Sequence, residues 1–158
     1  MKTRTTTRIW LKLLLCSLLS LAFGTSAYAA RVHLKTDPVV HDLGSNLETC
    51  LSLAGLGNKD ITIIAEVKGT ASVTYINPGG NTPAGQNKFP ISEFSSVTVP
   101  SNQVKNGTVS VCLTSPNVDP GDAPNPNWTV RLDDVEFDSV TITVIQGGKV
   151  VLKKTVNL

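Results

Sequence analysis

Apolar and polar residues alternate with a period of two in several short segments, and this pattern constrains the fold more than any other feature. Two segments show it most clearly. Residues 47–53 have Leu at three of four alternate positions, and residues 140–144 have Val or Ile at every second position. Clusters of Gly, Pro, Asn and Asp separate the segments, and none has the spacing of three and four that indicates an amphipathic helix. The chain is therefore predicted to be all-β.

The turn residues predict how some of the strands pair. Gly147-Gly148 readily adopts the positive φ angles of a type I′ turn, so residues 140–144 and 150–156 are expected to form a hairpin. A second hairpin is predicted for residues 61–67 and 71–75, with Lys68-Gly69 as its turn. Seven or eight strands in a chain of this length favour a two-sheet antiparallel sandwich over a closed barrel.

Two further features locate an edge and an irregularity in the sheets. Pro90 lies within the strand predicted for residues 89–99, and proline cannot donate a hydrogen bond to a ladder, so this strand is expected at a sheet edge. Val135 and Phe137 are odd-numbered, whereas Val140 and Ile142 are even-numbered. A β-bulge near Asp138-Ser139 is expected to absorb this change of phase.

The N-terminal residues 1–29 have the order of a secretory signal peptide. Four basic residues precede or adjoin the apolar run of residues 13–23, and small residues follow it up to Ala29. The run is shorter than the roughly 20 residues that a membrane-spanning helix needs. Residues 30–158 are thus expected to form a single exported β-sandwich domain, periplasmic or secreted, without a membrane span.

Charge and motif content exclude several classes of partner and cofactor for residues 30–158. This part holds 10 basic and 12 acidic residues and has no basic stripe beyond Lys153-Lys154, so no nucleic acid partner is expected. The glycine-rich segments lack the Gly-Lys-Ser/Thr of a phosphate-binding loop. No cofactor is expected.

Removal of residues 1–29 leaves two cysteines, Cys50 and Cys112, in a protein destined for an oxidising compartment, where they are expected to form one disulfide. Both cysteines are out of phase with their apolar neighbours Leu51 and Val111. The bridge is therefore expected to join two strands through their polar faces, outside the middle of the core.

Three segments resemble a group of small exported bacterial proteins whose function is unassigned: Ala54-Gly-Leu-Gly-Asn-Lys-Asp60, Gly69-Thr-Ala-Ser-Val-Thr74 and Asn77-Pro-Gly-Gly-Asn81. The resemblance extends from about residue 47 to residue 158. It implies an immunoglobulin-like sandwich and supplies no catalytic or binding residues. The chain differs from true antibody-type domains, which have a Trp between their two cysteines, because it has none there.

Candidate chemical groups are few. His33 and His41 are the only histidines and no nucleophile motif accompanies them, so no catalytic residue is assigned and the protein is not expected to be an enzyme. Asp134, Glu136 and Asp138 would project from one strand face and are candidate Ca²⁺ ligands. Their alternation with apolar residues is also the ordinary pattern of a half-solvated strand, which is the favoured interpretation, so no metal site is assigned.

Trp128 is the one candidate for a binding residue, as a surface platform on which a sugar could stack. Its phase with Val130 and Leu132 favours a place in the core instead. The favoured function is a non-catalytic binding or interaction module for an extracytoplasmic protein or glycan, monomeric rather than oligomeric. The alternative is a structural or adhesive subunit that assembles through strand edges, and a secreted hydrolase is less favoured than either.

The purified exported protein is predicted to begin at Ala30, because Ala27 and Ala29 are the best-placed small residues for signal peptidase. Intact-mass measurement checks this start. A mass that includes residues 1–29, or one that carries diacylglycerol on Cys16, would contradict it.

Overall fold

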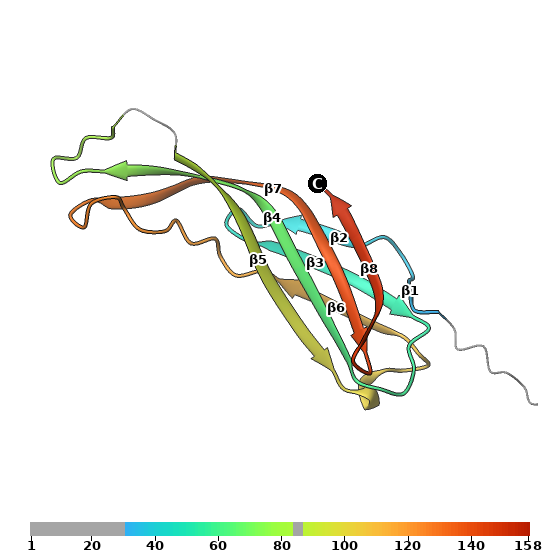
Figure 1. Ribbon diagram of the computed structural model, residues 1–158. Helices are drawn as coiled ribbons and strands as arrows, with labels where there is room; N and C mark the ends of the chain where they lie inside the picture. Colours follow the sequence, from blue (N-terminus) through green and yellow to red (C-terminus); the bar gives the residue numbers. More distant parts are fainter. Residues whose placement is uncertain (1–30, 84–86) are drawn as a thin grey trace, which may run out of the picture.

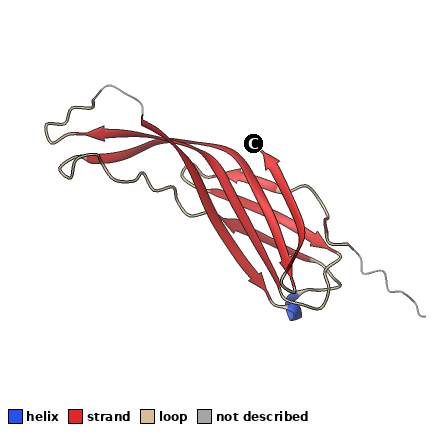
Figure 2. Ribbon diagram, in the orientation of Figure 1, coloured by secondary structure: helices blue, strands red, loops and turns tan. Residues whose placement is uncertain are grey.

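The computed structural model describes residues 31–83 and 87–158, so the predicted signal peptide and its cleavage site lie outside the described residues. Eight β-strands form two antiparallel sheets (Figures 1 and 2). Sheet A contains β1 (His33–Leu34), β2 (Val39–Asp42), β3 (Leu47–Ala54) and β6 (Val109–Thr114). Sheet B contains β4 (Ile61–Ile76), β5 (Asn87–Val99), β7 (Thr129–Gln146) and β8 (Lys149–Asn157). The predicted all-β sandwich is confirmed.

The chain crosses between the two sheets three times, after β3, after β5 and after β6. In sheet A, β6 pairs with one side of β3, while β1 and β2 pair with different parts of its other side. Sheet B has the order β5-β4-β7-β8. This return of the chain to a sheet it has already left is the connectivity of an immunoglobulin-like sandwich.

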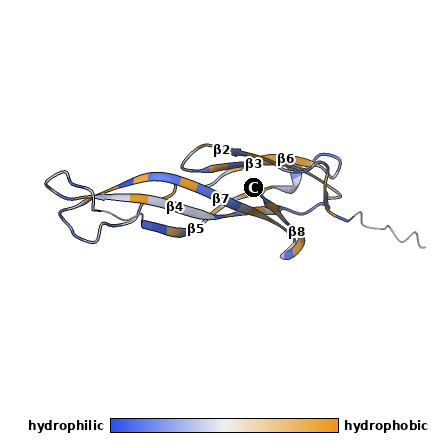
Figure 3. Ribbon diagram, turned by 90° about the horizontal axis from the view of Figure 1, so that it is seen from above, coloured by the Kyte–Doolittle hydropathy of each residue, from blue (hydrophilic) through white to orange (hydrophobic). Residues whose placement is uncertain are grey.

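The core lies between the two sheets, and the period of two in the sequence decides which side chains enter it. In β3, Leu47, Thr49, Leu51 and Leu53 are buried, and the residues between them are half-exposed. In sheet B, Ile61 to Val67 and Val140 to Val144 bury alternate residues in the same way. Figure 3 shows the two layers and the alternation of hydrophilic and hydrophobic residues along β7.

The hairpin predicted for residues 61–67 and 71–75 is wrong, because both segments belong to the single strand β4. Buried residues stay odd-numbered across Lys68-Gly69, as one continuous strand requires. A two-residue turn there would instead have placed Glu66 opposite Ala71, which mixes a polar and a core side chain on one face. The sequence contained this signal, which the turn-forming Lys68-Gly69 dipeptide obscured.

The other expectations about strand pairing are confirmed. β7 and β8 form the C-terminal hairpin, and Gly147 and Gly148 have φ angles of 59° and 77°. β5 pairs with β4 alone and is an edge strand of sheet B. The expected bulge is also present, since Lys68 lies opposite Ser139 and Gly69 opposite Phe137, which leaves Asp138 as the extra residue.

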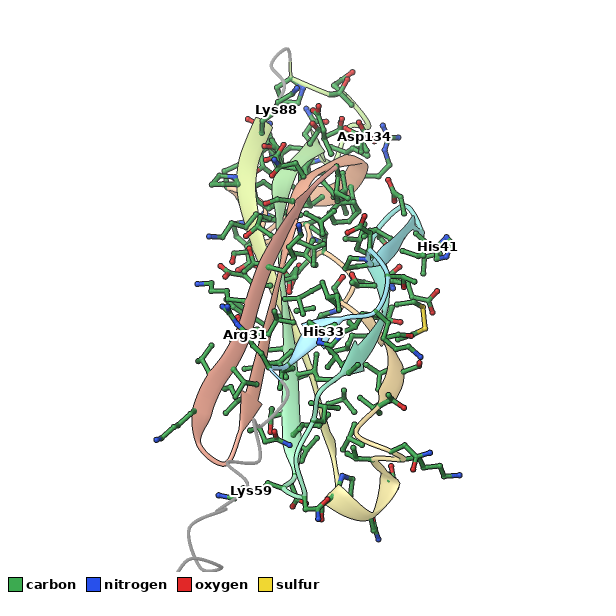
Figure 4. All side chains as sticks on the ribbon, turned by 90° about the vertical axis from the view of Figure 1, so that its right-hand side faces the viewer. Arg31, His33, His41, Lys59, Lys88 and Asp134 are labelled. Carbon is green, nitrogen blue, oxygen red and sulfur yellow. A yellow bond between two sulfur atoms is a disulfide. The ribbon has the colours of Figure 1, made fainter. Side chains whose placement is uncertain are left out.

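The disulfide between Cys50 and Cys112 joins two directly opposite residues of β3 and β6, with Cα atoms 4.0 Å apart. Cys50 is half-buried and Cys112 is exposed, so the bridge lies on the outer face of sheet A, as the phase of the sequence predicted. Antibody domains instead link their two sheets through the core. The side-chain view in Figure 4 shows the bridge on the outer side of the β-sandwich, toward the end where His41 lies.

We predict that the Cys50→Ser, Cys112→Ser double variant folds but loses about 2–4 kcal/mol of unfolding free energy, because the bridge constrains mainly the unfolded chain and serine is tolerated on a solvated face. Urea unfolding measures the loss. Thiol titration of the denatured, unreduced wild-type protein is the control, and two reactive thiols would contradict the bridge.

Gly69 is predicted to be irreplaceable, because a Cβ atom there would lie 2.2 Å from the backbone oxygen of Glu136 and 2.9 Å from the Cα of Phe137. Backbone must move to relieve such contacts, so Gly69→Ala should cost about 3 kcal/mol in urea unfolding. Gly57→Ala is the matched control, since its Cβ would meet nothing closer than 3.6 Å. Equal losses in the two variants would refute the argument.

Candidate binding site at the open side of the sandwich

One edge of β7 has a strand partner along only half of its length. β7 pairs with β4 from Thr129 to Gln146, but β8 covers only Ser139 to Gln146 on the other side. The backbone N–H of Leu158 extends that ladder by donating to the oxygen of Asp138 at 3.0 Å. Within residues 31–83 and 87–158, the same side of β7 from Thr129 to Phe137 has no strand partner.

A groove of about 380 Å³ runs beside this free edge, between β7 of sheet B and the β2 side of sheet A. Its apolar lining includes Leu47, Val135 and Phe137, which are buried and form its floor. Asp42, Asp134 and Glu136 are exposed and form its rim. We call this feature the edge groove; Val40 and Leu158 complete its lining.

The edge groove is acidic. Three of its lining residues carry carboxylates, and the lining contains no Lys or Arg. The nearest cation along β7, Arg131, binds Asp133 through its Nε at 2.9 Å. Asp134 lies at the end of the molecule where Lys88 is also found (Figure 4). A ligand at this groove therefore meets a negative rim around an apolar floor.

Asp133 is the extra residue of a second bulge in β7, between the partners of Ser72 and Val73. The hydroxyl of Thr74 donates a hydrogen bond to its carboxylate. This bond lowers the pKa of Asp133 below its usual value, with further contributions from the hydrogen bond and the charge of Arg131. The interaction holds the carboxylate over β4, away from the free edge of β7.

The acidic residues proposed as calcium ligands are separated by the strand geometry. Asp134 and Glu136 lie opposite Ser72 and Thr70 on the outer face of sheet B, while Asp138 occupies the first bulge. Their carboxylates do not form a group of three ligand atoms within 4.8 Å. In the part of the chain that the structure describes, the one group that meets this distance contains Glu48 and the two disulfide-bonded cysteines.

The remaining sequence candidates are scattered. His33 lies opposite Ala54, and its Nδ1 is 2.9 Å from the oxygen of Arg31. His41 lies opposite Glu48 on the exposed side of β2. Trp128 is half-buried just before β7 and is not among the residues packed against the core, so its expected core position is wrong. β7 begins at the end of the molecule where sheet B extends beyond sheet A (Figure 1).

Sequence reasoning found the acidic strand but missed the other members of the edge groove. Asp42 and Leu47 are paired residues of β2 and β3, whereas Leu158 follows β8, and nothing in the local sequence of either part points to the other. The groove depends on where β8 stops along β7. In the described structure, β8 pairs with β7 from Ser139 to Gln146.

A larger hollow of about 730 Å³ lies at the other end of the sandwich and is lined by Leu56, Asn106, Gly107 and Gln146, among others. The amide of Gln146 is already engaged there: it accepts from the N–H of Gly57 at 3.1 Å and donates to the oxygens of Gly57 and Lys59. These bonds tie the β3–β4 connection to β7. We interpret that hollow as part of the loop structure.

No family model and no curated protein sequence matches the chain. Solved structures that match include DesR, a beta-glucosidase from Streptomyces venezuelae in complex with D-glucose, at 13% identity and a TM-score of 0.29 over 80% of this chain. A glycosyl hydrolase family 2 member from Bacteroides cellulosilyticus matches at 12% identity and a TM-score of 0.28 over 82% of this chain. The chain spans 15% and 14% of these two structures.

Helical structure within the described ranges is limited to the three-residue 3-10 helix η1, Ser101–Gln103. Within the described ranges, no helix is long and apolar enough to cross a membrane.

Thr74→Val is predicted to raise the pKa of Asp133 toward its ordinary value of 3.8, because it removes the hydrogen bond that lowers that pKa most. NMR titration of the carboxyl carbon measures it. A lowered pKa stabilises the folded state above the unfolded pKa, and this contribution is lost as pH falls through the folded pKa. On acidification, the Thr74→Val variant should therefore lose less unfolding free energy through Asp133 than the wild-type protein does.

Thr143→Val is the control for this comparison, because Thr143 lies on the outer face of β7 opposite Ile64 and not beside Asp133. An Asp133 pKa that is the same in Thr74→Val and in wild type would refute the assigned cause.

Proposed function

We propose that the protein is an exported, non-catalytic binding module that engages its ligand at the edge groove. The observation that carries the proposal is the combination of an unpaired strand edge with an apolar floor and an acidic rim. Unpaired backbone groups supply hydrogen bonds, the floor supplies apolar contact, and the rim supplies charge selection. A sandwich scaffold is compatible with such a surface, and the proposed function rests on the site and not on the fold.

Two features support export and a non-catalytic role. The disulfide on the outer face of sheet A fits an oxidising compartment, in line with the signal-like residues 1–29. His41 alternates with Val40 and Asp42 along β2, so its side chain points away from the two neighbours that line the edge groove. The groove thus presents carboxylates and apolar side chains to a ligand.

A structural subunit that assembles through strand edges is the second candidate. It is favoured by the edges of sheet B, since the outer sides of β5 and β8 are both unpaired in the described structure. Pro90 on β5 and Lys149, Lys153 and Lys154 on β8 oppose it, because proline and lysine protect edges against self-pairing. The balance favours the binding module.

Sedimentation velocity of the mature protein over a wide concentration range separates the two candidates. A single monomeric species is expected for the binding module. Growth of the species with concentration would instead support the structural subunit and contradict the module.

Binding itself is tested with the labelled mature protein on peptide and glycan arrays. Saturable retention on one ligand class is expected, with loss in the Asp134→Lys, Glu136→Lys variant. The Asp37→Lys, Asp122→Lys variant has the same change in net charge at two exposed residues outside the groove and should keep retention. Absence of retention on every array feature would overturn the proposed function.

A further inference from the structure

We propose that the ligand of the edge groove is an extended peptide segment of a partner protein, with basic and apolar residues in alternation, that adds a strand to the free edge of β7. The inference rests on the proposed function and specifies its ligand class. Four observations lead to it: the open ladder, the two faces of β7, the charge of the rim and the position of the bulges.

The open ladder fixes the conformation of the ligand. A strand that pairs with β7 beyond β8 would occupy the same layer of sheet B, about 4.8 Å from β7. Its position would continue the ladder that ends at Leu158, whose N–H binds the oxygen of Asp138. Only an extended chain offers the N–H and C=O groups at the spacing that such an edge requires.

The two faces of β7 determine how apolar and polar residues alternate along the ligand. Val135 and Phe137 point toward the core and line the edge groove, whereas Asp134 and Glu136 lie on the outer face. Side chains of an added strand alternate between the same two faces. Every second ligand residue would therefore meet the apolar floor, and the residues between them would meet the two carboxylates.

Charge complementarity fixes the polar half of the ligand. The rim carries Asp42, Asp134 and Glu136, and the groove lining contains no basic side chain. An acidic strand placed beside Asp134 and Glu136 would bring like charges directly opposite each other, which destabilises a strand pair. Lys or Arg at these positions gives attraction instead, so the partner segment is basic.

The bulges limit the length that can pair regularly. Asp133 and Asp138 interrupt the β4–β7 ladder on either side of residues 134–137. Bulged residues disturb a ladder and twist an edge away from further pairing. Only the four residues 134–137 between the bulges can pair regularly, so a short segment satisfies the site and a long flat strand such as a second copy of β5 does not.

The test uses an acetylated and amidated peptide, Lys-Val-Lys-Val-Lys-Val-Lys, with a fluorophore, titrated with the mature protein and followed by fluorescence anisotropy. Saturable binding is expected, weakened by added salt because charges at the rim contribute. The Asp134→Lys, Glu136→Lys variant should bind about tenfold more weakly or worse. The Asp37→Lys, Asp122→Lys variant, with the same net charge, should bind like wild type.

Two matched peptides separate strand addition from simple ion attraction. The Glu-Val-Glu-Val-Glu-Val-Glu peptide should not bind, and a Lys/Val peptide with N-methyl groups on alternate residues should lose binding because it cannot complete the ladder. Equal binding of either one overturns the proposal, as does equal weakening in both charge-reversed variants.

Hydrogen exchange of the wild-type protein gives a readout that does not depend on any variant folding. The Lys/Val peptide should slow exchange of free-edge amides within residues 129–137 and leave the β5 edge unchanged. Protection at β5 instead, or none at all, overturns the proposal. If the array retains the protein on glycans while these peptides fail, the binding module stands and the peptide inference falls.

Discussion

The ladder between β4 and β7 is the interaction on which the rest of the sandwich depends. It pairs Ile61 through Ile76 with Gln146 through Thr129, and β5 and β8 are attached to its two sides. Two bulges on β7 restore the inward direction of its apolar residues after each change of phase. At the first bulge the backbones approach so closely that only glycine fits at position 69. This register thus determines both the core and the position of every other strand in sheet B.

The same ladder creates the open side, because β7 is long and β8 is short. β8 accompanies β7 only as far as Ser139, while β4 accompanies it to Thr129. An unpaired edge is normally a risk for aggregation. Acidic side chains and two bulges border the free edge of β7. They disfavour the pairing of an uncharged or acidic strand with this edge. The features that protect the edge would also select a basic partner.

Sheet A is the smaller layer, and the disulfide reinforces it. β3 has eight residues and β6 has six, and the bridge joins them at the centre of their ladder on the solvated face. Leu47 and Thr49 of β3 fill the core below while Cys50 stays outside. The core of the sandwich consists mainly of aliphatic side chains, and the covalent link does not interrupt their packing.

The sequence by itself determined the strand class, the final hairpin, the bulge at Asp138 and the face on which Cys50 and Cys112 meet, because each of these follows from side-chain alternation and turn residues within a short segment. Its unbroken odd-numbered phase across β4 also indicates one strand, but the turn-forming composition of Lys68-Gly69 obscured it, and only the tertiary structure shows that glycine is needed there for the close approach of the Glu136 backbone. Trp128 lies in phase with core residues, yet it is only half-buried, and it precedes β7 at the end where sheet B extends beyond sheet A. The edge groove was likewise decided by the tertiary structure alone, because it joins Asp42, Leu47 and Leu158 to β7 through the relative lengths of strands that are far apart in the chain.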